Sequence, residues 1–147
     1  MTTEAPRFDI QDNSYRIKEA RRNRYLTFDD DAHDNVVTME DAKVYWTVQM
    51  RSNSGDATIT EKNSENVLDC EGGAGPNVIL YSINGNGTDN QRWVITETGD
   101  DDHSQYIESV QNNNHVLVAD PGHSRKCNVH IARKGSSVNE KWVFVKQ

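Results

Sequence analysis

Three tryptophans divide the chain into nearly equal parts. Trp46, Trp93 and Trp142 lie 47 and 49 residues apart, and three such periods nearly equal the 147 residues of the chain. A fixed period of this length indicates a repeated supersecondary unit, which constrains the fold more than any single motif does. The residues around the three tryptophans are also alike, at positions 44–48, 91–95 and 140–144.

Two further features recur with the same period. A leucine preceded by an apolar or aromatic residue lies 20 to 25 residues before each tryptophan: Leu26, Leu68 and Leu117. Between leucine and tryptophan comes an Asn-Val step: Asn35-Val36, Asn77-Val78 and Asn128-Val129. We therefore predict one domain of three repeats, at residues 8–51, 54–98 and 103–147.

The local pattern predicts an all-β protein. Short runs rich in Val, Ile, Tyr and Thr alternate with turns rich in Gly and Asn, and no stretch keeps a helical apolar period over three turns. The runs are residues 15–17, 36–39, 58–60, 78–81, 106–110, 129–132 and 142–145. About four strands per repeat would close into a barrel without exposed edges, whereas three propeller blades would be too few to close. We therefore predict a β-trefoil with pseudo-threefold symmetry.

Charge and composition exclude several functions. A net charge of −7 argues against a nucleic-acid surface, which needs a basic patch. The basic cluster at residues 16–24 is followed by Asp29, Asp30 and Asp31, so we expect solvated strand and loop charge. No apolar run approaches the ~18 residues of a membrane span. The first nine residues lack the apolar segment of a secretory signal, which predicts a cytoplasmic protein.

Catalytic and metal-binding motifs are not evident in the sequence. The acidic runs at residues 29–33 and 100–103 lack the spacing of a calcium loop or of a zinc enzyme. Cys70 and Cys127 occupy different places in their repeats and are expected to be reduced thiols. The Ser, Cys and His residues form no nucleophile motif. We expect neither enzymatic activity nor a metal or cofactor.

A family resemblance lies in the residues around the tryptophans. Asn90-Gln91-Arg92-Trp93 resembles the Q-x-W motif of ricin-B-type lectin domains, and Asn139-Glu140-Lys141-Trp142 is a degraded copy of it. Val44-Tyr45-Trp46 keeps only the tryptophan. In that family three such repeats build a β-trefoil, and each repeat can hold one shallow sugar site. The chain is similar to small cytoplasmic lectins of fungi, and its tryptophans are interpreted as core anchors.

The resemblance places a carbohydrate site in the second repeat. The family's aspartate, aromatic and asparagine correspond to Asp69, Tyr81 and Asn90, with Gln91 supporting the site from behind. A carboxylate can accept two vicinal hydroxyl protons, an aromatic ring can cover a sugar's C–H patch, and an amide can both donate and accept. This predicts binding of a terminal galactose- or mannose-type sugar. Ile79, where some family members carry a polar residue, leaves the galactose preference open.

Each of these residues also has a structural interpretation. Asp69 could cap a turn, Tyr81 could be an ordinary exposed strand residue, and Asn90 could shape the loop before Trp93.

The other two repeats lack this constellation. The corresponding residues of the first repeat are Thr27, Met39 and Lys43. The third repeat has Val118 for the aspartate and Ala132 for the aromatic residue; it keeps Asn139 but has Glu140 in place of the glutamine. Asp120, His123 and His130 could form a different pocket, but we expect a solvated loop there. The lost sites favour an alternative class, a protein-interaction module such as the lectin-like light subunit of mushroom tyrosinase or a trefoil protease inhibitor. Expected partners are therefore glycans or glycoproteins, or a larger protein subunit.

Overall fold

The fold consists almost entirely of short antiparallel strands. The computed structural model describes residues 13–30, 34–51, 55–70 and 77–147. These residues form twelve strands and one 3₁₀ helix. The strands are β1 (Ser14–Glu19), β2 (Arg24–Asp29), β3 (Asn35–Glu40), β4 (Trp46–Met50), β5 (Asp56–Glu61), β6 (Val67–Cys70), β7 (Val78–Tyr81), β8 (Trp93–Glu97), β9 (Gln105–Ser109), β10 (His115–Ala119), β11 (Cys127–Arg133) and β12 (Trp142–Lys146), with helix η1 (Asp89–Gln91) before β8. The one helix of the described residues, the short η1, is not a candidate for a membrane span.

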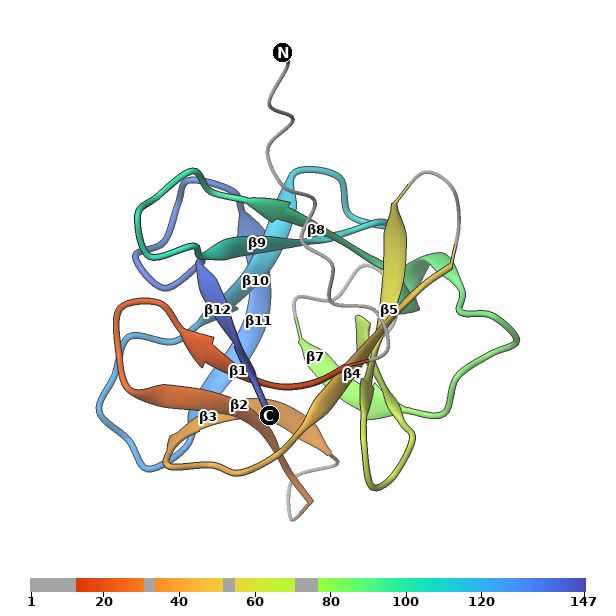
Figure 1. Ribbon diagram of the computed structural model, residues 1–147, viewed down its shortest axis with the longest axis horizontal. Coiled ribbons are helices and arrows are strands. Elements are labelled where there is room, and N and C mark those ends of the chain that lie inside the picture. Colours follow the sequence, from red (N-terminus) through yellow and green to blue (C-terminus); the bar gives the residue numbers. More distant parts are fainter. Residues whose placement is uncertain (1–12, 31–33, 52–54, 71–76) are drawn as a thin grey trace.

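Six of the strands close into a barrel. Antiparallel pairings run from β1 to β4, β5, β8, β9 and β12 and back to β1. Three hairpins, β2–β3, β6–β7 and β10–β11, cap one end, and β3 pairs with both β7 and β11 (Figure 1). This arrangement is a β-trefoil, as predicted. Each predicted repeat supplies four strands, but the repeat boundaries stay a prediction because residues 1–12 and 52–54 lie outside the described part.

Each tryptophan joins the last strand of its repeat to the second strand. Every indole Nε1 donates a hydrogen bond to the carbonyl of the repeated leucine: Trp46 to Leu26 at 3.2 Å, Trp93 to Leu68 at 3.1 Å, and Trp142 to Leu117 at 2.9 Å. All six side chains are fully buried in one core. The interpretation of the tryptophans as core anchors therefore agrees with the structure, and the identical bond in each copy expresses the pseudo-threefold symmetry.

A buried polar residue ends the first strand of each repeat. Glu19, Glu61 and Ser109 lie opposite the three tryptophans in the barrel ladder. The Glu61 carboxylate accepts hydrogen bonds from the backbone N–H groups of Asn63 and Ser64 at 2.7 and 2.9 Å. Ser109 Oγ accepts one from the Asn112 N–H at 3.1 Å. In the second and third repeats this position therefore closes the turn that leads from the barrel into the cap.

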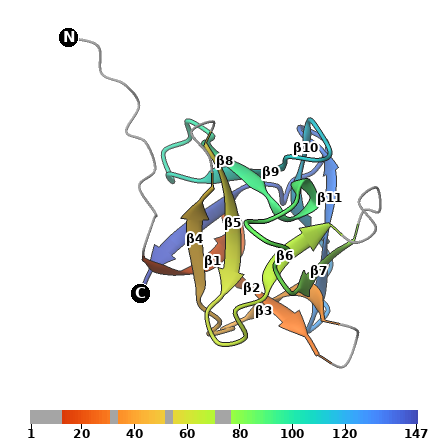
Figure 2. The ribbon, with the colours of Figure 1, turned by 90° about the vertical axis from the view of Figure 1, so that its right-hand side faces the viewer.

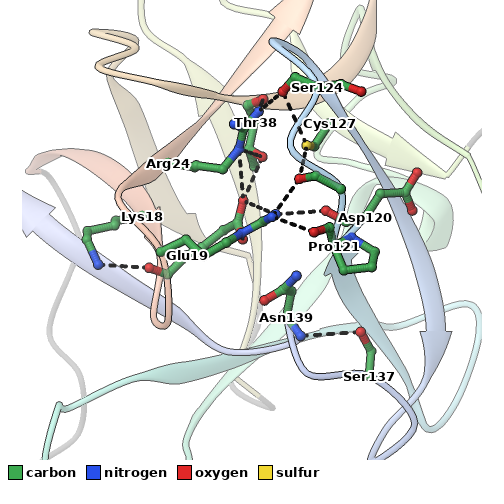
Figure 3. A network of polar contacts seen from close by, with 12 residues as sticks. Lys18, Glu19, Arg24, Thr38, Asp120, Pro121, Ser124, Cys127, Ser137 and Asn139 are labelled. Carbon is green, nitrogen blue, oxygen red and sulfur yellow. Dashed lines mark hydrogen bonds and ion pairs between the residues drawn. The ribbon is translucent and has the colours of Figure 1, made fainter.

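Glu19 occupies the same position in the first repeat but binds side chains instead. Its carboxylate accepts hydrogen bonds from Arg22 Nε at 2.7 Å and from Thr38 Oγ1 at 2.6 Å, and it lies 3.7 Å from Arg24 Nε. The carboxylate raises the pKa of Arg22 above its ordinary value, chiefly through this hydrogen bond. Figure 3 shows the resulting network between the first and third repeats.

The same network corrects one expectation about the basic cluster at residues 16–24. Arg24 is only 6% exposed, so its charge is not solvated. Its guanidinium donates to the carbonyls of Ser124 and Arg125 at 3.0 and 3.1 Å, and Arg22 donates to the carbonyl of Asp120 at 2.7 Å. Carbonyl acceptors and the Glu19 carboxylate compensate the loss of water, which is the condition under which a charge can be buried.

Candidate functional site

The β6–β7 hairpin sets the directions of the candidate side chains. Its register pairs Asp69 with Ile79 and Val67 with Tyr81. Directly opposite residues of an antiparallel pair project to the same face, and successive residues alternate. The residues between them, Leu68 and Leu80, belong to the hydrophobic core. Asp69 and Tyr81 therefore lie on the outer face as diagonal neighbours, a relation that usually separates Cα atoms by ~7–8 Å.

The Asp69 carboxylate is the centre of the site. The side chain is 5% exposed, and its Oδ1 accepts a hydrogen bond from Asn90 Nδ2 at 2.9 Å. Its Oδ2 accepts one from Gln91 Nε2, also at 2.9 Å. A carboxylate has about four lone-pair positions, so each oxygen can still accept one further hydrogen bond. These contacts bring together three of the residues predicted for the site, and they differ from the turn-capping role considered for Asp69.

Gln91 fixes the loop behind the carboxylate. Its side chain is fully buried, and its Nε2 also donates to the carbonyl of Ser82 at 2.9 Å. Its Oε1 accepts from the backbone N–H of Asn84 at 3.0 Å. The amide is thus bonded on both of its ends, and it ties the segment after Tyr81 to Asp69. Ser82 and Asn84 carry no signal in the sequence, because both contribute backbone groups only.

Asn90 is oriented by the turn that begins η1. Its Oδ1 accepts a hydrogen bond from Thr88 Oγ1 at 2.5 Å, while its Nδ2 points to Asp69. One hydrogen of an amide NH₂ group suffices for the bond to Asp69, so the second can serve another acceptor. The loop-shaping role and the site role of Asn90 therefore coincide in one side chain.

Tyr81 supplies the aromatic surface. It is 55% exposed, which makes it one of the few large apolar side chains at the surface of the described residues. The register places it on the same face of the hairpin as Asp69, as its diagonal neighbour.

Cys70 follows Asp69 but lies on the core face of the hairpin. Burial raises the pKa of its thiol to about 11; the hydrogen bond with Ser109 opposes this, and the nearby Asp69 charge adds a smaller increase. A thiol with this pKa stays protonated at neutral pH, and the neutral form is a poor nucleophile. The core face of this hairpin therefore serves packing, and the polar chemistry is confined to its outer face.

Gly87 holds the loop between β7 and η1 against the barrel. Its φ is +97°, and a Cβ at this position would lie 2.8 Å from Thr58 Cγ2. We expect Gly87→Ala to lower the free energy of unfolding by ~2–4 kcal/mol, because backbone strain and overpacking add. Urea unfolding measures this loss. Gly85→Ala is the matched control, since Gly85 also has a positive φ of +59° but faces open space; equal losses in the two variants would contradict the packing argument.

The strand registers locate the equivalent positions in the other repeats. Thr27 and Val118 replace Asp69, and they lie opposite Val37 and His130 as Asp69 lies opposite Ile79. Met39 and Ala132 replace Tyr81 by the same criterion, opposite Tyr25 and Val116. Neither repeat therefore has a carboxylate or an aromatic ring at these two positions.

The alternative group in the third repeat is only partly assembled. Asp120 Oδ1 lies 3.2 Å from His130 Nδ1, so these two side chains are in contact. His123 is exposed and lines a separate hollow with Arg24 and Arg125.

Comparison with known proteins places this arrangement in a family. The ricin-type beta-trefoil lectin domain-like family matches residues 42–132, which is more than half of the chain. The protein therefore belongs to the ricin-type β-trefoil lectin domain-like family. No curated protein sequence matches the chain.

Solved structures with the same fold include designed and natural proteins. The designed threefold-symmetric protein ThreeFoil matches with a TM-score of 0.80 and 21% identity over 92% of this chain and 100% of its own. The Polyporus squamosus lectin, solved with a human-type influenza-binding epitope, matches with a TM-score of 0.78 and 21% identity over 92% of this chain. A mosquitocidal holotoxin matches with a TM-score of 0.81 and 20% identity over 94% of this chain. The chain spans 49% of the Polyporus lectin and 18% of the holotoxin. At these identities the likeness shows the fold alone.

Proposed function

We propose that the protein is a non-catalytic lectin that binds a terminal galactose- or mannose-type sugar. The binding residues are Asp69, Tyr81 and Asn90, with Gln91 behind them. The observation that carries this proposal is the Asp69 carboxylate, whose two oxygens are held by Asn90 Nδ2 and Gln91 Nε2 at 2.9 Å each beside an exposed aromatic ring. Membership of a lectin-like family supports it.

The geometry suits recognition of two neighbouring hydroxyl groups. A carboxylate that is already fixed by hydrogen bonds loses little conformational freedom when a sugar binds, and its bonds to hydroxyls are charge-assisted. Tyr81 would cover an apolar C–H patch of the sugar ring. A shallow site of this kind makes few contacts, so we expect a dissociation constant on the order of 0.1–1 mM. Ile79 offers no hydrogen bond opposite Asp69, so the proposal covers both sugar types.

Substitution of the carboxylate tests the site. We expect Asp69→Asn to weaken binding of methyl β-galactoside or methyl α-mannoside at least ~10-fold, because a neutral amide loses the charge-assisted bonds and places an NH₂ group toward the donors of Asn90 and Gln91. Calorimetric titration with both sugars measures the change. Thr27→Val, at the equivalent position of the first repeat, is the control and should leave binding unchanged. Sugar binding that survives Asp69→Asn would contradict the site.

A protein-interaction module is the second candidate. It is favoured by Thr27 and Val118, which leave the first and third repeats without the carboxylate. Under this hypothesis neither sugar binds, and the protein instead associates with a larger enzyme subunit or inhibits a cysteine protease. Papain inhibition and co-purification with a larger subunit test it directly.

We also propose a cytoplasmic location. It is supported by Cys70 and Cys127, two buried thiols that form no disulfide with each other, as expected in a reducing compartment.

A further inference from the structure

Three equivalent rows of four residues cross the outer face, and each runs from the last strand of one repeat through the first three strands of the next, from the barrel into the cap. Each row takes the name of the repeat that supplies three of its residues. The ladder pairs define these rows, because residues directly opposite one another project to the same face. In the second repeat the row is Thr47, Thr60, Val67 and Tyr81. In the third repeat it is Val94, Glu108, Val116 and Ala132, and in the first it is Val143, Lys18, Tyr25 and Met39. The row that contains Tyr81 therefore differs from its two counterparts in carrying two hydroxyl groups in the barrel wall.

The first and third repeats have large side chains next to their rows. In the first repeat the Arg16 guanidinium stacks over the Tyr25 ring, 3.7 Å from its centroid. In the third repeat Lys134 Nζ lies 4.3 Å from the centroid of Tyr106. The register gives Arg16 and Tyr106 the same place as Thr58 in the second repeat. Thr58 is fully buried, and its Oγ1 accepts a hydrogen bond from Arg51 Nε at 2.9 Å, so a small side chain stands where the other two repeats have a cation and an aromatic ring.

A hollow of about 470 Å³ lies at the barrel end of the row that contains Tyr81. It is lined by Thr47, Gln49, Arg51, Thr60, Lys62, Glu65 and Ile83. Its volume falls within the ~300–1,000 Å³ of small-molecule sites. Hydroxyl, amide and charged groups around one apolar side chain offer both donors and acceptors, which is the mixture that a hydroxyl-rich sugar ring requires.

The hollow adjoins the candidate site through one short segment. Ile83 lines it, while the neighbouring residues Ser82 and Asn84 bind Gln91 through their backbone groups. Tyr81 lies two residues before Ile83 and ends the row that begins with Thr47 and Thr60. Figure 2 shows the β4–β5 wall and the β6–β7 hairpin on the same side of the molecule. A ligand that extends past Tyr81 would therefore meet the hollow.

We infer that this hollow binds the second sugar of an oligosaccharide whose terminal sugar occupies the Asp69 site. The inference rests on the proposed function and extends it from a monosaccharide to a glycan of at least two units. The hydroxyls of Thr47 and Thr60 and the amide of Gln49 bind the second ring, and Tyr81 lies between the two subsites.

Calorimetric titration with paired probes tests this inference. The probes are methyl β-galactoside against lactose, and methyl α-mannoside against α-1,2-mannobiose. We expect the disaccharide of the preferred pair to bind about fivefold to thirtyfold more tightly than its monosaccharide, the gain of one or two added hydrogen bonds. The double variant Thr47→Val/Thr60→Val should remove this gain and leave monosaccharide binding unchanged. Valine occupies the place of Thr47 in both other repeats, so the fold tolerates it there.

The controls separate the two proposals. Thr96 is the counterpart of Gln49 next to the row of the third repeat. Thr96→Val should therefore change neither the monosaccharide affinity nor the disaccharide affinity. Equal affinity for monosaccharide and disaccharide, or a disaccharide gain that survives the double variant, overturns this inference and leaves the lectin proposal standing. Binding of no probe overturns both.

Discussion

Glu19→Gln is expected to lower the free energy of unfolding by ~3–5 kcal/mol and the Tm by roughly 10 °C, because it removes the only carboxylate in contact with the buried Arg24 guanidinium among the described residues. A buried cation left without its anion keeps its desolvation cost and loses the attraction that offset it. Thr38 Oγ1 also loses a charged acceptor at 2.6 Å. Urea unfolding at neutral pH measures the loss.

The pseudo-threefold symmetry provides the control for this variant. Glu61 holds the equivalent position and is equally buried, but its carboxylate accepts two backbone N–H bonds and has no cation beside it in the described structure. Glu61→Gln should therefore cost only ~1–2 kcal/mol, the loss of one charged acceptor. If both variants lose the same stability, the ion pair is not what stabilises the first repeat.

Trp93→Ala is expected to cost ~3–5 kcal/mol, the range of large-to-small changes at fully buried aromatic positions. The indole is 0% exposed, and its Nε1 donates to the Leu68 carbonyl at 3.1 Å. Removing it would leave a cavity directly beneath the β6–β7 hairpin and an unpaired carbonyl next to Asp69. Thermal and urea unfolding both measure the effect.

Phenylalanine variants separate the two contributions. Trp93→Phe keeps most of the apolar volume and removes the hydrogen bond, so we expect a loss of ~1–3 kcal/mol. Trp46→Phe and Trp142→Phe remove the same bond in the other repeats and should lose similar amounts. A loss below about 1 kcal/mol for Trp93→Ala would show that the tryptophan is not a core anchor.

The sequence predicted the fold because its signal is periodic. Trp46, Trp93 and Trp142 each bond to a leucine in the same repeat, so one physical contact is repeated three times and leaves a visible spacing. The alternation of apolar residues then identified the strands. The period shows the repeated unit even though the barrel pairings of β1 with β4, β5 with β8 and β9 with β12 each join strands that two other strands separate in sequence.

The sequence could predict the candidate site only where side chains form its contacts. Asp69, Asn90 and Gln91 are brought into contact as the resemblance implied. The loop groups that hold Gln91 were missed, because backbone groups have no residue signature. The hollow lined by Thr47 and Thr60 was missed for another reason: these two residues meet only because β4 of one repeat pairs with β5 of the next.

The burial of Arg24 was missed because its compensation is long-range. Its carbonyl partners at Ser124 and Arg125 are about a hundred residues away in sequence. A cluster of arginines followed by aspartates is usually solvated, and only the tertiary structure shows that this one closes the contact between the first and third repeats.

The closing pair of the barrel has a consequence for how the chain folds during synthesis. β1 and β12 are joined by five register pairs, from Tyr15 with Lys146 to Glu19 with Trp142. The ring therefore cannot close on the ribosome before residues 142–146 have been made, although the hairpins within each repeat need only local contacts. Until then the nascent chain exposes the unpaired edge of β1, the kind of surface that chaperones shield.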